Sequence, residues 1–146
     1  EDDISGKLML NVAIVEGNKI GLDIRYPVTI SKEIIVDGIQ EAVSQYGLRL
    51  EEHDFLRAIH MDQKLPFIQT LMKIYQNETG ELDATPISSG GATYARAMDN
   101  IVAFGPSNIN HQQFEHQPNE QVLISDIKLA MKIYYETFKE LVFEAQ

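Results

Sequence analysis

The chain contains no cysteine among its 146 residues. Disulfide bonds and thiolate metal sites are therefore excluded. The motifs HExxH, CxxC and HxH, which supply two metal ligands at once, do not occur in it either. A catalytic zinc ion usually takes three protein ligands, so one histidine of this chain cannot complete a zinc site by itself.

Basic residues and long apolar segments are also scarce. The chain has 12 Lys and Arg residues and 22 Asp and Glu residues, which gives a net charge of −10 at pH 7. Phosphate backbones are bound by basic patches, so this balance argues against nucleic acid as a partner. No apolar run is long enough to span a membrane and no signal-peptide pattern is present, so we expect no membrane partner and a cytoplasmic location.

Length and composition indicate a globular protein. A chain of this length, 44% hydrophobic, ordinarily forms one domain and can bury most of its extended surface. The sequence begins Glu1-Asp2-Asp3 without an initiator methionine. We therefore interpret the chain as a fragment of a longer protein.

A hairpin is predicted near the start of the chain. Apolar residues alternate over 8–14 and again over 20–26, and residues 16–18 between them favour a tight turn. Side chains alternate between the two faces of a strand. We therefore expect Asp23 and Arg25 on the face opposite Leu22 and Ile24.

A helix and a third strand are predicted to follow the hairpin. Ser31 is a candidate N-cap, an apolar stripe at helical spacing runs over residues 35–46, and Gly47 ends the pattern. Residues 48–51 then have the pattern of a short strand. The resulting ββαβ unit resembles part of a split βαβ sandwich, the ferredoxin-like fold.

The second half of the chain alternates helices with one apolar run. Pro66 can begin a helix that Gly80 ends, and Ser125 is a candidate cap for a long amphipathic helix that extends to residue 142. Between these helices, the unbroken apolar run over 101–104 is typical of a strand buried on both faces.

A domain boundary is predicted between the two halves. Residues 55–65 lack periodicity and suit a connection, so we assign residues 1–62 to one domain and 63–146 to another. The mixture of strands and helices makes the expected fold class α/β.

Two segments carry groups suited to ligand binding. Gly90 and Gly91 can bring backbone amides close to an anion, and His116 can offer a neutral imidazole to a metal ion. These residues, and Arg25 of the hairpin, also have plainer interpretations. The glycines can serve a turn with positive φ, Arg25 can pair with Asp23 on a solvated strand face, and a lone histidine in a loop is usually a surface residue.

Four segments together resemble the carnosinase-type di-zinc dipeptidases. They are residues 22–27, 90–96, 103–106 and 116–120, which include the sequences LDIRYP, GGATYAR, AFGP and HQPNE. Their order and approximate spacing match the C-terminal third of that family. The resemblance implies an α/β catalytic domain that holds two zinc ions, with a smaller ferredoxin-like lid inserted into it. Residues 1–62 would then be the second part of the lid, and residues 63–146 the C-terminal part of the catalytic domain.

The resemblance also implies roles for individual residues. Arg25 resembles the lid arginine that binds the free carboxylate of a dipeptide, and Gly90 and Gly91 resemble the backbone that helps to hold it. Arg96 either supports these glycines or pairs with a nearby acid. His116 resembles the one zinc ligand that the family supplies near its C-terminus, and His111 is a competing candidate.

The activity implied is hydrolysis of β-Ala-Xaa or Xaa-His dipeptides by a water molecule that two Zn²⁺ ions activate. The remaining ligands and the general base would lie upstream of this chain, so we expect the isolated chain to be inactive. We also expect it to self-associate or to bind its missing N-terminal portion. An alternative from another class is a small ferredoxin-like module that binds a ligand or dimerises without catalysis.

Overall fold

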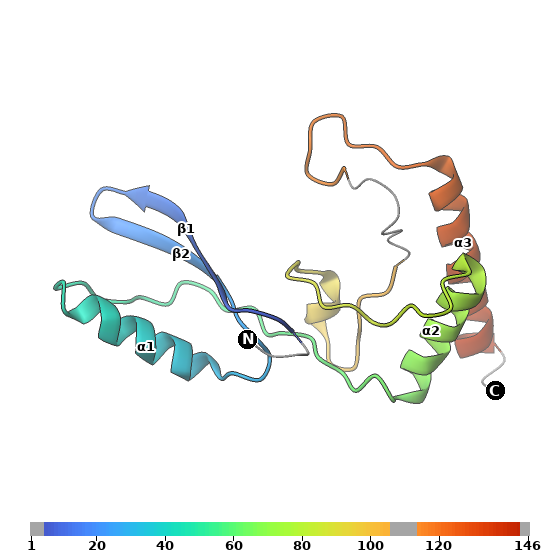
Figure 1. Cartoon of the computed structure of the whole chain (residues 1–146), viewed down its shortest axis with the longest axis horizontal. Helices are drawn as coiled ribbons and strands as arrows, with labels where there is room; N and C mark the ends of the chain where they lie inside the picture. The colour runs from blue at the N-terminus through green and yellow to red at the C-terminus, as the bar shows by residue number, and fades with distance from the viewer. Residues whose placement is uncertain (1–4, 106–113, 144–146) are drawn as a thin grey trace. The chain divides into compact units, whose positions relative to one another are not determined.

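A computed structural model describes residues 5–105 and 114–143 of the chain (Figure 1). It is a mixed α/β structure, with a two-stranded antiparallel sheet and three α-helices in the described residues, so the predicted class is confirmed. The chain divides into two compact units. The first comprises Glu1–His60 and Ile87–Ile101, and the second comprises Met61–Pro86 and Val102–Gln146.

Strands β1 (Met9–Glu16) and β2 (Lys19–Arg25) form the predicted hairpin. Gly17 occupies the turn with φ 59°, a left-handed conformation that glycine adopts without steric cost. A β-bulge lies between Val12 and Ile14, and beyond it Met9 pairs with Arg25. The bulge determines which residues of β1 lie beside the functional groups of β2.

Helix α1 (Lys32–Ser44) follows the hairpin. Ser31 is its N-cap residue, as predicted, and Glu33 lies in the first turn, where the helix dipole favours a negative charge. The Ser31 side chain makes no cap hydrogen bond to the helix. The helix is complete before Gly47, whose φ of 70° turns the chain away from the helix axis.

The strand predicted over residues 48–51 is wrong, because this segment is coil. Its contacts run to α1 and not to a neighbouring strand. Leu50 N donates to Gln40 Oε1 at 3.0 Å, and Lys32 Nζ donates to both carboxylate oxygens of Glu52 at 3.0 Å. The first unit therefore contains ββα in place of the complete ββαβ pattern.

The segment Ile87–Ile101 belongs to the first unit although residues 61–86 of the second unit precede it. It contains the short 3₁₀ helix η1 (Tyr94–Ala97), whose first turn is capped because Thr93 Oγ1 accepts a hydrogen bond from Ala95 N at 3.3 Å. Near its end, Asp99 forms an ion pair with Arg57. These contacts give a coil segment a defined position within the first unit.

Helices α2 (Pro66–Thr79) and α3 (Ile124–Phe138) form the centre of the second unit. Pro66 begins α2 and Gly80 ends it with φ 78°, as predicted. Helix α3 begins at Ile124, one residue before the predicted cap, and continues as the π-helical turn η2 (Lys139–Phe143).

Apolar side chains and one ion pair join α2 to α3. Ile68, Leu71 and Ile133 are buried, and Ile133 has no exposed surface. Lys132 Nζ lies 2.5 Å from Glu78 Oε2, and this contact raises the pKa of the lysine. The two helices lie side by side in Figure 1, and this pair contains most of the buried apolar residues of the described structure.

The strand predicted over residues 101–104 is also wrong, because these residues are coil. An aromatic contact with α3 holds their end. The rings of Phe104 and Tyr134 meet edge to face with centroids 6.3 Å apart, and Tyr134 Oη donates a hydrogen bond to Phe104 O at 3.4 Å. An apolar run can thus be held by a helix as well as by a sheet.

The hairpin exposes much of its apolar surface. Every residue of β1 is exposed, and the exposed fractions of Val12 and Ile14 are 54% and 61%. A two-stranded hairpin is marginally stable by itself in water. None of the helices in the described ranges is long and apolar enough to cross a bilayer.

Candidate functional site

The candidate site begins at Arg25, the last residue of β2. Its side chain lies on one face of the hairpin beside Asp23, and the cross-strand partners of these two residues are Met9 and Asn11. The four side chains line an open hollow of about 230 Å³. Arg25 Nη2 lies 3.3 Å from Asp23 Oδ2, and the arginine side chain is half exposed. The solvated ion pair expected from the plainer interpretation is therefore present.

A second group reaches the same arginine from another part of the first unit. A Cβ atom placed on Gly90 would lie 3.0 Å from Arg25 Nη1 and 3.4 Å from Arg25 Cδ. The backbone of Gly90 is thus in contact with the guanidinium group. Residues that are 65 positions apart in sequence therefore come together here.

The plainer interpretation of the glycines is not supported. The residues with positive φ include Gly6, Gly17, Gly47 and Gly80, but Gly90 and Gly91 are not among them. A left-handed turn therefore does not explain the pair. Close approach of a side chain to the backbone explains Gly90, because any larger residue would meet Arg25.

Arg96 contacts the same glycine segment. Its Nη2 atom donates to the carbonyl oxygen of Gly91 at 3.4 Å, and Gly91 N donates to Ser89 Oγ at 3.2 Å. Throughout the part of the chain that the structure describes, Arg96 has no carboxylate within ion-pair distance. Of the two expectations for Arg96, the observed contact matches support of the glycines.

The chemistry of this group of residues suits a carboxylate. A guanidinium group offers planar paired N–H donors that match the two oxygens of a carboxylate, and an uncrowded glycine backbone lets an anion approach closely. Asp23 occupies one nitrogen of Arg25, at 3.3 Å. Because a guanidinium group has five N–H donors, others remain for a ligand.

His116 lies in a turn of the second unit, and its side chain is exposed. Its φ is 62°, and that of Asn119 is 63°. Histidine and asparagine adopt left-handed backbone more readily than most non-glycine residues, and Asn100 adopts it as well. Gln117 N donates to Phe114 O at 3.2 Å and closes the turn. The competing candidate His111 lies outside the described residues.

The resident groups do not by themselves fit a zinc ion. In residues 5–105 and 114–143, no three His, Asp or Glu side chains are arranged so that they can hold a metal. His116 is one nitrogen donor, and a catalytic zinc site requires about three protein donors. No reaction step through a metal can be derived from these residues alone.

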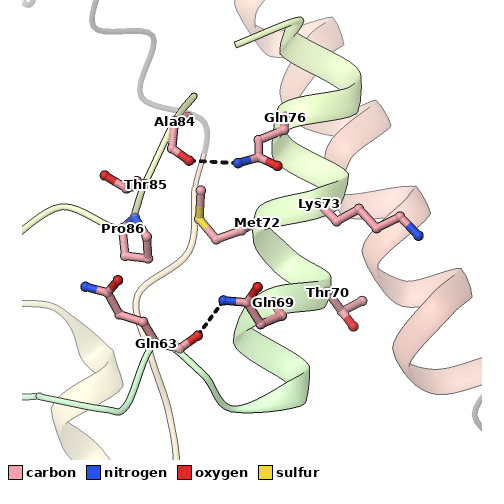
Figure 2. A pocket seen from close by; sticks show the side chains of 9 residues that line it. All are labelled: Gln63, Gln69, Thr70, Met72, Lys73, Gln76, Ala84, Thr85 and Pro86. Carbon is pink, nitrogen blue, oxygen red and sulfur yellow. Dashed lines mark hydrogen bonds between the residues drawn. The ribbon is translucent and has the colours of Figure 1, made fainter. Parts of the chain in front are cut away.

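A wider groove lies in the second unit, between α2 and residues 84–86 (Figure 2). It measures about 540 Å³. Two glutamine side chains of α2 bridge it to the backbone: Gln76 Nε2 donates to Ala84 O at 2.8 Å, and Gln69 Nε2 donates to Gln63 O at 2.7 Å. Met72 lies between these two hydrogen bonds. Its lining residues include no acid or histidine, and Lys73 is the one ionisable side chain among them.

Met9 and Asn11 are site residues that the sequence did not reveal. In a hairpin without a bulge, with Glu16 paired to Lys19 beside the turn, Val12 would be the cross-strand partner of Asp23 and Leu10 the partner of Arg25. The bulge shifts this pairing by one residue. No feature of the sequence between Val12 and Ile14 indicates the bulge, so the pairing could be read only from the structure.

Comparisons with known proteins identify similar sequences but no matching family model. The "Putative dipeptidase YtjP" of Bacillus subtilis is 36% identical over 97% of this chain. The "Putative dipeptidase SH1171" of Staphylococcus haemolyticus and a "Putative dipeptidase" of Staphylococcus epidermidis are 32% and 31% identical over the same share. The chain spans 31% of the length of each of these three proteins. It is therefore similar, over nearly all of its own length, to about a third of proteins that are named as dipeptidases.

Proposed function

We propose that this chain is part of a metal-dependent dipeptidase and that its first unit binds the free carboxylate of the substrate. The observation that carries the proposal is the contact between the Arg25 guanidinium group and Gly90. The printed names of the similar proteins supply the reaction class. The chain's coverage of about a third of those proteins is in keeping with a partial site.

Arg25 is the principal binding group in this proposal. Its ion pair with Asp23 fixes one side of the guanidinium group, and the remaining N–H donors would bind the ligand. No acceptor in the described part of the chain takes the N–H of Gly90. A carboxylate that bridges the guanidinium group and this amide would gain two charge-assisted hydrogen bonds, which are roughly twice as strong as neutral ones.

Gly91 and Arg96 complete the substrate-binding set. Arg96 donates to the carbonyl oxygen of Gly91, which restrains the peptide plane that follows Gly91. The guanidinium group of Arg96 also adds positive charge beside the glycines. Both effects favour an anion at this position.

His116 is proposed as a ligand of one of two Zn²⁺ ions, because the segment HQPNE resembles the C-terminal ligand motif of the family. The ions would supply the chemistry of water activation, and their other ligands would come from outside these 146 residues. The proposed substrates are β-Ala-Xaa or Xaa-His dipeptides. The same proposal accounts for the exposed apolar faces of β1, which the rest of the protein or a second chain would cover.

The first test is the activity of the purified chain. We expect it to hydrolyse no β-alanyl-histidine at any zinc concentration, because one histidine cannot hold the reactive metal pair. A longer protein that contains the chain and the upstream ligands should hydrolyse the dipeptide. Turnover by the isolated chain that a chelator abolishes would contradict the proposed division of the site.

The alternative of a ferredoxin-like binding module is less well supported. Such a module requires a strand after α1 that joins the hairpin, and residues 48–51 are coil. In the described first unit the sheet therefore consists of β1 and β2 alone, without the third strand of such a module.

A further inference from the structure

Gly90 and Gly91 are adjacent, but their surroundings differ. A Cβ atom on Gly90 would have three near neighbours, and all of them belong to Arg25: Nη1 at 3.0 Å, Cδ at 3.4 Å and Cζ at 4.0 Å. A Cβ atom on Gly91 would meet only Ser89 Oγ, at 3.4 Å, which is ordinary van der Waals contact. Residue 90 is therefore constrained by the arginine, and residue 91 is not.

We propose that Gly90 is a positioning residue for Arg25. The guanidinium group lies against the space that a side chain at residue 90 would occupy, so residue 90 sets how closely the guanidinium group approaches the glycine backbone. This inference rests on the proposed function, in which Arg25 binds the carboxylate and Gly90 acts through it. Asp23 holds the other side of the guanidinium group through Nη2.

Substitution at Gly90 should move the arginine without unfolding the chain. A separation of 3.0 Å is shorter than most carbon contacts, so one partner must shift by a few tenths of an ångström. Gly90 has no left-handed φ, so an L-residue fits its backbone without strain. The partner that shifts is the end of a flexible side chain. Alanine should therefore displace the guanidinium group slightly, and valine should displace it further.

Gly91→Ala is the matched control for this displacement. It adds the same methyl group one residue away, in contact with Ser89 and not with Arg25. If both glycines were needed only for their exposed backbone amides, the two alanine variants would behave alike. If Gly90 positions Arg25, only the variants at residue 90 should disturb the arginine.

The first measurement is the NMR cross-peak of the Arg25 Nε–H group in the isotope-labelled chain without ligand. We expect it to move in Gly90→Ala, to move further in Gly90→Val and to stay in place in Gly91→Ala, with unchanged circular dichroism in all three. Equal shifts in Gly90→Ala and Gly91→Ala, or no shift in either variant at residue 90, would overturn the inference.

The second measurement is a double-mutant cycle on the affinity of the chain for β-alanyl-histidine, followed by NMR titration. Gly90→Ala should weaken binding at least about two-fold when residue 25 is arginine and have no effect in the Arg25→Lys background. An equal loss in both backgrounds would show that Gly90 does not act through Arg25. If Arg25→Lys leaves the affinity unchanged, or if no dipeptide binds, the proposed function fails, and the ligand-free cross-peaks alone decide the positioning role.

Discussion

Replacing Arg25 with lysine tests the carboxylate site while keeping the charge. Lysine is a point charge on a flexible stem, whereas the guanidinium group presents paired, coplanar donors. In the structure, the guanidinium group lies between Asp23 and Gly90. A lysine ammonium group can still reach Asp23, but it cannot offer two parallel N–H donors to a carboxylate.

The size of the effect follows from the number and exposure of the hydrogen bonds. A hydrogen bond to a charged group contributes about 1.5–3 kcal/mol. The Arg25 side chain is half exposed, with 50% of its surface accessible, so water competes and the lower limit applies. Loss of one such bond, about 1.5 kcal/mol, corresponds to a rise in KM of roughly ten-fold.

The assay is steady-state hydrolysis of β-alanyl-histidine by a longer protein that contains the chain together with the proposed upstream ligands, with and without the substitution. We expect KM to rise and kcat to change little, because the carboxylate is held equally in the ground state and the transition state. Arg49→Lys is the matched control, since Arg49 is also paired with an acid two residues away, Glu51, at 2.9 Å. An unchanged KM for Arg25→Lys, or an equal rise for Arg49→Lys, would refute the reasoning.

Two further predictions concern the second unit. Ile133→Ala should lower the free energy of unfolding, measured by urea titration, by about 2–5 kcal/mol, because Ile133 is fully buried between helices. Ile127 lies on the same helix and is 45% exposed, so Ile127→Ala should lower it far less. Burial and a hydrogen bond to Glu81 raise the pKa of Tyr75 in the folded protein above the ordinary value of 10.0. The neutral tyrosine therefore contributes to the free energy of unfolding below pH 10, and this contribution is lost as the pH rises through the pKa of the folded state. Tyr75→Phe should remove this part of the alkaline loss of stability; an identical pH dependence in the variant would contradict the assignment.

Local signals in the sequence predicted much of the fold. Pro66 and Gly80 bound α2, and Ser31 precedes α1, because backbone restriction and capping act within a few residues. The hairpin was predictable because its two strands are joined by a two-residue turn at Gly17 and need no distant partner.

Strands that depend on distant partners were not predictable. Residues 48–51 and 101–104 have strand-like patterns, but a strand forms only when another strand pairs with it. In the described structure, the backbone N–H of Leu50 donates a hydrogen bond to the Gln40 side chain, and the backbone carbonyl of Phe104 accepts one from Tyr134. A periodic sequence pattern indicates which residues favour burial or an extended backbone, but it does not specify which other part of the chain they contact.

The candidate site was partly predictable. Arg25, Gly90, Gly91 and Arg96 were identified from motifs, and the structure brings these four residues together within the first unit. Their proposed roles, and that of His116 as a zinc ligand, remain predictions. The contact between the Arg25 guanidinium group and Gly90 could not be foreseen, because it depends on how two distant segments fold against each other.

The central claim is that the first unit recognises a free carboxylate, and the most direct measurement compares β-alanyl-histidine with its C-terminal amide. NMR titration of the chain should show the Arg25 Nε–H cross-peak moving with the free acid and remaining in place with the amide, since only the acid offers two charged oxygens to the guanidinium group. Equal responses to the two ligands at the same concentrations would contradict the account.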